Sequence, residues 1–397
     1  MSDTRHLAII GAGPIGVETA ARFADTDWTI ALYEADSIGA HVQQWGHVDL
    51  FSSWELNRSR WGRRRLRDAG AELAPDGEYP SGKAYVEKYL LPLAETLSDD
   101  VSIYRQTRIS GIARRKLLKS EAIGSPRRRD ESFLLNVDGP RGARFDEADV
   151  VVDATGVLGQ PNPVGPGGLS AVGESECDDR ILRRIPDVDD RDADLADRRI
   201  LLVGDGHSAI TSLDILCGLR TDAPDTEIIW AYRAAGEPRE VIDGDSLPGR
   251  ARLDHFGNRA ARGEVEGIKP LAETSIRRII DTGDGLDVIV DGPDDVQTVH
   301  VDRIVANIGY RPDTSLFREL QVHQCYATEG PMNLAATLIG GDGGDCLDQT
   351  SGGIETLESP EPDFWILGAK SYGRNSNFLL KVGFEQIEAV FDAYDLS

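Results

Sequence analysis

The sequence lacks the signals of several protein classes. Its four cysteines, Cys177, Cys217, Cys325 and Cys346, are too far apart to form a CxxC or CxxxxC pair, so no disulfide framework is expected. Its seven histidines show no metal-ligand spacing, and we expect no metal site. No apolar run reaches the roughly 18 residues of a membrane span. An apolar strand begins by Leu7, which leaves no room for a signal peptide, so we expect a cytoplasmic protein.

Positive charge is also scarce. The 397 residues carry a formal net charge of −25, and only seven of the 43 basic residues are lysines. Such a surface disfavours nonspecific binding to nucleic acid or anionic lipid, so we expect neither as a partner. Two local basic runs, Arg58 to Arg67 and Arg127 to Arg129, are interpreted as solvated faces or loops. The length allows two or three domains.

A glycine-rich motif near the start has the pattern of a dinucleotide fingerprint. The motif Gly11-Ala12-Gly13-Pro14-Ile15-Gly16 lies between an apolar strand pattern at 7–10 and a helical pattern from Val17. Its glycines permit a tight turn, a close approach to pyrophosphate, and packing of the helix on the strand, while the helix N-terminus attracts phosphate. A second strand, 29–33, ends on Glu34, 18 residues after Gly16. This carboxylate is placed to hydrogen-bond an adenosine ribose.

A second motif with the same context lies at the middle of the chain. Gly204-Asp205-Gly206-His207-Ser208-Ala209 follows a strand pattern at 199–203 and precedes a helical pattern at 210–219, with Ala209 in place of the third glycine. The next strand, 227–232, ends on Arg233, where the first copy has Glu34. A cation here suits the 2′-phosphate of NADPH. A solvated surface arginine is the other interpretation. Two such motifs indicate an enzyme that uses a flavin and a nicotinamide.

The segments around the two motifs predict an α/β fold. Between the motifs we expect a helix over 84–97, a strand over 101–104, and a small antiparallel meander at 133–137 and 143–145. The strand 149–153 runs into Ala154-Thr155-Gly156, and a stretch rich in Pro and Gly at 159–168 indicates a crossover to a second domain. Residues 302–313 bring the chain back, 364–368 are a predicted strand, and 375–393 a predicted helix. The fold predicted is α/β with two Rossmann-like domains, one inserted into the other.

These segments resemble the flavin-containing monooxygenase-like branch of the two-dinucleotide-binding-domain flavoproteins, which are relatives of the pyridine nucleotide-disulfide oxidoreductases. The matching stretches occur in family order and run nearly end to end: 11–34, 152–156, 204–209, 308–313 and 366–368. The resemblance implies an FAD-binding domain formed by 1–165 and 306–397. Its return segment would hold a substrate loop at 321–353 and the C-terminal helix. Residues 166–305 would form an inserted NAD(P)H-binding domain.

The resemblance also implies which residues contact the cofactors. For FAD they are Gly11, Gly13, Pro14, Ile15, Gly16, Glu34, Ala35, Gln44, Trp45, Gly368, Ser371 and Phe378. The two crossover strands would supply further cofactor-binding residues, namely Thr155, Gly156, Ile308 and Gly309. For NADPH, with NADH as the alternative, they are Gly204, Gly206, His207, Ser208, Ala209 and Arg233. Gln44 and Trp45 would lie by the flavin ring, although a core or loop position for Trp45 is an equal expectation.

Three departures from the family pattern bear on activity. The monooxygenase fingerprint FxGxxxHxxx is absent, since residues 157–198 contain neither histidine nor phenylalanine. The close cysteine pair of the disulfide reductases is absent too, which argues against dithiol chemistry of the usual kind. Ala369 follows Gly368 where many relatives carry an aspartate on the ribityl hydroxyls. That contact would instead come from the backbone or from Ser371.

The segment 370–377 supplies the candidates for oxygen chemistry. A monooxygenase needs a dry pocket with a hydrogen bond to the activated oxygen, and Tyr372, Arg374, Asn375 and Asn377 are the predicted donors. The other interpretation is a polar helix cap, with Asn375 or Ser376 as the N-cap. The segment 321–353 would line the substrate pocket, and we expect its two cysteines, Cys325 and Cys346, to be buried or idle rather than redox-active.

Three functions remain open from the sequence. The first is an FAD enzyme that takes hydride from NADPH and activates molecular oxygen toward a small organic substrate. The second is an FAD reductase or dehydrogenase that passes electrons to a quinone, a thiol or another acceptor without oxygen insertion. The third is a non-catalytic dinucleotide-binding redox sensor, against which two intact phosphate-binding motifs argue. The chain is expected to be a monomer or a homodimer.

Overall fold

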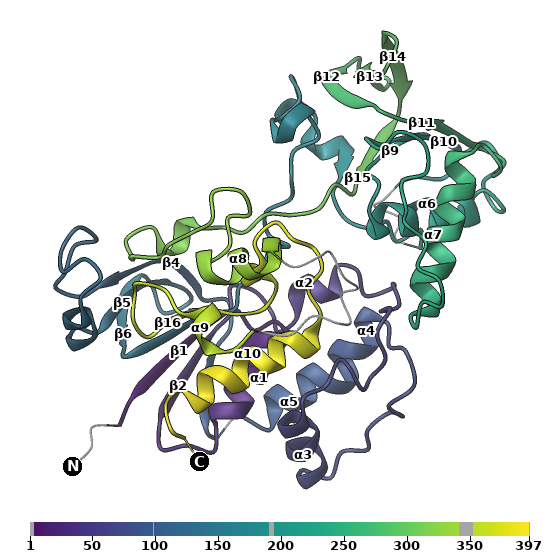
Figure 1. Cartoon of the computed structure of the whole chain (residues 1–397). Coiled ribbons are helices and arrows are strands. Elements are labelled where there is room, and N and C mark those ends of the chain that lie inside the picture. Colours follow the sequence, from purple (N-terminus) through teal and green to yellow (C-terminus); the bar gives the residue numbers. More distant parts are fainter. Residues whose placement is uncertain (1–3, 98, 190–193, 341–351, 397) are drawn as a thin grey trace. The chain divides into compact units, whose positions relative to one another are not determined.

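A computed structural model describes residues 4–97, 99–189, 194–340 and 352–396. The chain divides into two compact units, each built around a parallel sheet (Figure 1). The first unit consists of Met1–Gln160 and Tyr310–Ser397, and the second consists of Pro161–Gly309. The second unit is therefore inserted into the sequence of the first. Cys346 lies outside the described residues.

The first unit contains a five-stranded parallel sheet in the order β16-β7-β1-β2-β3. Its strands are β1 (His6–Ile10), β2 (Thr29–Tyr33), β3 (Val101–Tyr104), β7 (Val150–Asp153) and β16 (Phe364–Ile366). Because β1 lies between β2 and β7, the strand order reverses at β1, and the carboxyl end of such a strand is where open α/β sheets bind ligands. A three-stranded antiparallel sheet adds β4 (Arg108–Arg114), β5 (Phe133–Asp138) and β6 (Arg144–Ala148).

Helices complete the first unit. They are α1 (Pro14–Phe23), α2 (Ala40–Gln43), α3 (Arg60–Asp68), α4 (Gly82–Tyr85), α5 (Leu91–Glu95), α8 (Met332–Gly340), α9 (Ile354–Leu357) and α10 (Leu380–Asp392). A π-helical turn, Val86–Leu90, joins α4 to α5, so the predicted helix over 84–97 is one helical stretch with a π turn inside it. Short 3₁₀ turns lie at Pro126–Asp130, Ser315–Phe317 and Gly368–Tyr372.

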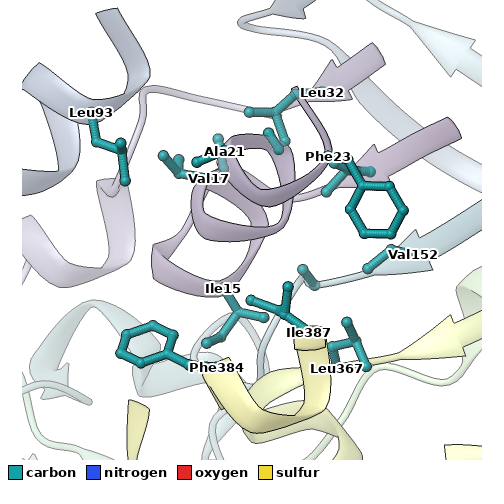
Figure 2. Packing of buried hydrophobic residues seen from close by; sticks show 14 of the residues in the cluster. Ile15, Val17, Ala21, Phe23, Leu32, Leu93, Val152, Leu367, Phe384 and Ile387 are labelled. Atoms are coloured by element: carbon teal, nitrogen blue, oxygen red, sulfur yellow. The ribbon is translucent and has the colours of Figure 1, made fainter. Parts of the chain in front are cut away.

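The main core of the first unit forms where α1 packs against α10 (Figure 2). Val17 of α1 and Ile387 of α10 are fully buried. Burying an aliphatic side chain of this size contributes about 1.5 to 3 kcal/mol. Gly383 lets the helices approach, since a Cβ at this position would lie 2.3 Å from Cδ1 of Ile15. This packing fixes the start of α1, and with it the first glycine motif.

The second unit repeats the arrangement with a parallel sheet in the order β11-β10-β9-β15-β8. Its strands are β8 (Ile181–Leu182), β9 (Arg199–Val203), β10 (Glu227–Ala231), β11 (Ile268–Leu271) and β15 (Arg303–Ala306). Its helices are α6 (His207–Leu219) and α7 (Pro248–Ala261), with 3₁₀ turns at Pro166–Gly168 and Ser175–Arg180. A separate antiparallel sheet contains β12 (Ser275–Asp281), β13 (Leu286–Asp291) and β14 (Val296–Val301).

The structure corrects the predicted start of the last helix. The sequence pattern predicted a helix from Asn375, whereas α10 begins at Leu380 with Leu379 as its N-cap residue and no side-chain cap. Asn375 instead accepts a hydrogen bond from the backbone amide of Asn377 at 2.9 Å, which closes a local turn before the helix. The polar-cap interpretation of Asn375 and Ser376 is therefore wrong, because the helix starts later.

The interpretation of the basic runs as solvated is wrong for two arginines. Arg58 is 3% exposed and donates to Asp76 at 2.6 Å. Arg128 is fully buried and donates to Glu361 at 2.8 Å. The rest of the first run forms α3, in which side chains such as Arg60 are exposed. In both cases the carboxylate partner offsets part of the free energy that is needed to remove the arginine charge from water.

Candidate functional site

A cavity of about 660 Å³ lies in the first unit, at the carboxyl ends of β1, β2, β7 and β16. Turns that follow these four strands supply most of its lining. Of the predicted FAD contacts, those that line it are Gly11, Gly13, Pro14, Ile15, Glu34, Ala35, Gln44, Trp45, Thr155, Gly156, Gly368 and Phe378. The structure therefore brings together residues from five separate stretches of the sequence.

The first glycine turn has the tight backbone that its sequence predicts. Gly11 has φ +95°, and a Cβ there would lie 2.8 Å from the carbonyl oxygen of Ala154. A Cβ at Gly16 would lie 1.8 Å from the carbonyl oxygen of Gly11, so Gly16 lies in the turn's packing and does not line the cavity. Gly13 faces open space, with no atom within 4 Å of a Cβ built there. Only Gly13 leaves room for a ligand against the backbone.

Glu34 follows β2 and holds the glycine turn. Its carboxylate accepts hydrogen bonds from the backbone amides of Ala12, at 2.7 Å, and Asp36, at 2.8 Å. The backbone amide of Gly11 in turn donates to the carbonyl oxygen of Tyr33 at 2.7 Å. The carboxylate is thus fixed beside the turn and remains on the cavity wall.

A buried ion pair that the sequence analysis did not identify lies in the same wall. Lys370 donates to Asp153 at 2.6 Å and to the hydroxyl of Thr155 at 2.9 Å. Lys370 is 2% exposed and Asp153 is fully buried. Two features of the sequence could have indicated this pair. Lys370 is one of only seven lysines and lies two residues after Gly368, and Asp153 ends an apolar strand.

The structure places Ser371 and Tyr372 in the core and not on the cavity. The Ser371 hydroxyl donates to the carbonyl oxygen of Gly368 at 2.8 Å and accepts from the Gln386 amide at 2.9 Å. Tyr372 is 1% exposed, and burial raises the pKa of its hydroxyl to about 12. That hydroxyl has no hydrogen-bond partner among the residues described. Neither side chain reaches the cavity, because the 3₁₀ turn at Gly368–Tyr372 directs them inward.

The other three candidates for oxygen chemistry lie near the surface. Arg374 forms an ion pair with Glu329 at 2.9 Å. Asn375 is half-buried in its local turn, and Asn377 is exposed. None of them lines the cavity. The described part of 321–353 does not line it either, and there the hydrogen bonds from Thr328 lower the pKa of the Cys325 thiol.

The second glycine turn follows β9 in the second unit. Gly204 has φ +128°, and a Cβ there would lie 2.3 Å from the carbonyl oxygen of Asn307. The Gly204 carbonyl oxygen accepts from the indole N–H of Trp230 at 2.8 Å. Gly206 is open, with no atom within 4 Å of a built Cβ. Ala209 is fully buried beneath the turn, whereas Ser208 is exposed at the start of α6.

A charged cluster lies at the start of α6, and the sequence analysis identified only its histidine. Asp254 of α7 accepts from Arg239 at 2.7 Å and lies 3.0 Å from Nε2 of His207. Nη2 of Arg239 lies 2.9 Å from the same ring nitrogen. Burial and the charge of Arg239 lower the pKa of His207, against the opposing effect of Asp254. Arg239 is thus a cation held close to the second glycine turn.

The remaining predicted contacts of this part of the chain lie at the ends of β10 and β15. Arg233 is exposed, two residues after the end of β10. Ile308 and Gly309 follow β15, and their carbonyl oxygens accept from the side chain and backbone amides of Asn162, at 3.1 and 3.0 Å. Ile308 and Gly309 belong to the second unit and do not line the first-unit cavity.

Two further properties concern metals and membranes. Within the described ranges, no group of three or more His, Cys, Asp or Glu side chains is arranged to hold a metal ion. Over the same ranges, every helix is too short or too polar to cross a membrane.

Comparison with solved structures identifies the fold. Bacillithiol disulfide reductase from Bacillus cereus matches with a TM-score of 0.67 at 16% identity, over 98% of each chain. An ornithine N-hydroxylase from Kutzneria, solved with reduced FAD, NADP⁺ and L-ornithine, matches with a TM-score of 0.62 at 16% identity, over 99% of this chain and 100% of the other. The chain has the fold of the two-domain FAD and NAD(P) flavoproteins.

A third solved structure matches the chain over nearly its whole length. Thioredoxin reductase from Lactococcus lactis matches with a TM-score of 0.59 at 15% identity, over 99% of this chain and 98% of the other. No protein-family model and no curated protein matches the sequence. The predicted α/β fold with two Rossmann-like domains is confirmed.

Proposed function

We propose that the protein is an FAD-dependent NAD(P)H oxidoreductase that passes electrons to a small external acceptor. FAD is assigned to the first unit and the nicotinamide dinucleotide to the second. The observation that carries the proposal is the first-unit cavity, where an open glycine turn, the start of a helix and a fixed carboxylate meet. These are the groups that recognise a pyrophosphate and a ribose.

The residues present fit FAD. A cavity of about 660 Å³ lies within the range of about 300 to 1,000 Å³ that is typical of cofactor sites. Gly13 leaves space against the backbone for the pyrophosphate, and the start of α1 offers unpaired amides to it. Glu34 offers carboxylate oxygens to a ribose. Gln44 and Trp45 line the part of the cavity assigned to the flavin ring.

The second unit is proposed to bind NADPH in preference to NADH. Gly206 leaves open space at the start of α6, as Gly13 does at α1. Arg233 and Arg239 both lie on the segment after β10, where a 2′-phosphate is recognised in this fold. The Asp254 carboxylate holds Arg239 in place at 2.7 Å. Arginine is suited to this task because its fork pairs with phosphate oxygens.

The electron acceptor is proposed to be external and not a cysteine pair of this chain. When bound, FAD would take a hydride from the reduced nicotinamide and pass the electrons on. Among the residues that the structure describes, no cysteine lines the cavity. Bacillithiol disulfide reductase, which shares the fold, is named for a disulfide acceptor, so a small disulfide belongs among the compounds to test, together with a quinone.

Oxygenation is a second candidate function. The observation that favours it is the likeness to the ornithine N-hydroxylase. The four predicted oxygen-site residues, Tyr372, Arg374, Asn375 and Asn377, lie away from the cavity, which weighs against it. We therefore rank oxygen insertion below reduction of an external acceptor.

The proposal is tested on the purified protein in two steps. Bound flavin is first identified after denaturation, with FAD as the expected result and a colourless protein that does not take up FAD as the contradicting one. The reduced protein is then mixed separately with oxygen, a soluble quinone and a low-molecular-weight disulfide. Rapid reoxidation by the quinone or the disulfide, with oxygen giving only hydrogen peroxide, supports the acceptor assignment. Slow peroxide release and a hydroxylated product favour the oxygenase.

A further inference from the structure

We propose that Lys370 is a positioning residue for the pyrophosphate of the dinucleotide in the first-unit cavity. This inference rests on the proposed function and adds to it, because neither the glycine motif nor Glu34 requires a buried lysine. Lys370 lies on the cavity wall. Its ammonium group is held by Asp153 at 2.6 Å and by the Thr155 hydroxyl at 2.9 Å.

The ion pair contributes its lysine, and not its aspartate, to the residues of the cavity wall. Lys370 and Thr155 line the cavity, whereas Asp153 does not. Asp153 is fully buried at the end of β7, where its second oxygen accepts from the backbone amide and hydroxyl of Thr155, at 3.1 and 2.7 Å. Both oxygens of the carboxylate thus accept hydrogen bonds from protein donors. An ammonium group has three N–H donors, and the contacts with Asp153 and Thr155 use two of them.

The ammonium group lies next to the phosphate-binding turn. Thr155, which accepts its hydrogen bond, abuts Gly11, since a Cβ at Gly11 would lie 3.0 Å from the Thr155 Cα. The ring of Phe317, in the 3₁₀ turn at Ser315–Phe317, also lies close to the ammonium group, with its centroid 5.3 Å from Nζ. Lys370 therefore has neighbours from both this turn and the residue that packs on the glycine turn.

The charges of the cavity wall favour a cation beside a bound pyrophosphate. Among the described residues, three carboxylates line the cavity, those of Glu34, Asp36 and Asp313, against two permanent cations, Arg108 and the Asp153-paired Lys370. The pyrophosphate of FAD would add further negative charge to this acidic wall. The amides at the start of α1 offset part of it, and a fixed ammonium group would offset more. Of the two cations, only Lys370 is buried.

The test compares two probes that differ only in phosphate. Flavin-free protein is titrated calorimetrically with ADP and with adenosine. The main variant is the double substitution Lys370→Gln and Asp153→Asn, which removes both charges and leaves neither partner buried alone. We expect ADP to bind about tenfold more weakly and adenosine to bind within about twofold of wild type, because a charged hydrogen bond is lost only with the phosphate. Lys370→Arg should retain most of the ADP affinity.

A milder variant keeps the test usable if the double variant does not fold. Thr155→Val retains both charges and removes the hydroxyl that fixes the ammonium group, and ADP is expected to bind about threefold more weakly with adenosine unaffected. Equal losses for ADP and adenosine would assign the ion pair a structural role only, and unchanged ADP binding in either variant would overturn the inference. If the wild-type protein binds neither probe, the FAD assignment itself fails, which is a separate outcome.

Discussion

Glu34 accepts a hydrogen bond from the backbone amide of Ala12 at 2.7 Å, so the acid at the end of β2 braces the glycine turn after β1. The two residues are 22 positions apart in the sequence and follow the neighbouring parallel strands β1 and β2. One side chain therefore holds the turn and also lines the cavity. The sequence suggested only the second of these roles.

Replacing Glu34 by Ala is expected to weaken FAD binding by about tenfold or more, because a charged acceptor for two backbone amides and for the ribose is lost. The measurement is the dissociation constant for FAD, from quenching of flavin fluorescence in flavin-free protein. Glu147→Ala is a matched control, since Glu147 is a surface acid of β6 outside the cavity. Unchanged FAD affinity in the Glu34 variant would remove this residue from the site.

Substitutions of two glycines in the first motif are expected to have different effects, one on stability and the other on FAD binding. Gly16→Ala should destabilise the fold by about 1 to 3 kcal/mol, because the new Cβ would meet the Gly11 carbonyl oxygen. Gly13→Val should leave the unfolding midpoint nearly unchanged, since a Cβ there meets nothing within 4 Å, yet abolish FAD binding. Urea unfolding and FAD titration measure the two effects. A Gly13 variant that binds FAD normally would contradict the placement of the pyrophosphate.

Glu18 gives the first unit a pH-dependent stability. This α1 side chain is fully buried and accepts from the hydroxyls of Ser59, at 2.6 Å, and Tyr89, at 2.5 Å. Burial raises its pKa from 4.5 to about 7, although these hydrogen bonds oppose the shift. Between these two pH values the folded chain keeps a proton that the unfolded chain has released. Stability therefore falls as pH rises through this window and levels off above about 7.

Glu18→Gln is expected to flatten that dependence. The shift from 4.5 to about 7 corresponds to roughly 3 kcal/mol at 1.36 kcal/mol per pKa unit, and the variant should lose this part of the change between acidic and neutral pH. Urea unfolding in a series of buffers measures it. Glu388→Gln is the control, because hydrogen bonds from Arg22 and Arg60 offset burial and lower the pKa of Glu388, so its effect falls at lower pH. A Glu18 variant with the wild-type pH profile would contradict the assignment.

Arg233 and Arg239 are expected to determine the preference for NADPH. Arg233→Gln and Arg239→Gln should each weaken NADPH binding by about tenfold while changing NADH binding little, because only NADPH carries the 2′-phosphate. The measurement is KM for both nucleotides in flavin reduction. Equal changes for NADPH and NADH would show that the arginines do not contact that phosphate.

Much of the fold follows from local patterns. The strands β1, β2 and β9 and their glycine turns could be predicted because apolar runs and glycine spacing are local signals. The strand β12 was missed, since its sequence Ser275–Asp281 carries Arg277 and Arg278 at exposed positions and has little apolar periodicity. Arg128 could not be recognised as buried, because its partner Glu361 is 233 positions away.

The candidate site was predictable where it depends on the backbone and not where it depends on side-chain direction. Gly11, Gly13 and Glu34 lie where the motif places them. Ser371 and Lys370 are adjacent and both buried, but their side chains leave the turn in different directions, since Ser371 donates to Gly368 and Lys370 donates to Asp153 and Thr155. No sequence pattern distinguishes these two directions in a short 3₁₀ turn.

Anaerobic reduction by NADPH shows whether the protein holds a flavin that a reduced nicotinamide can reach. The purified protein, loaded with FAD, is mixed with NADPH or NADH under argon while the flavin absorbance is followed. We expect stoichiometric NADPH to bleach the flavin absorbance, and NADH to bleach it more slowly. A protein that binds no FAD, or a bound flavin that NADPH and NADH both leave oxidised, would contradict the proposed function.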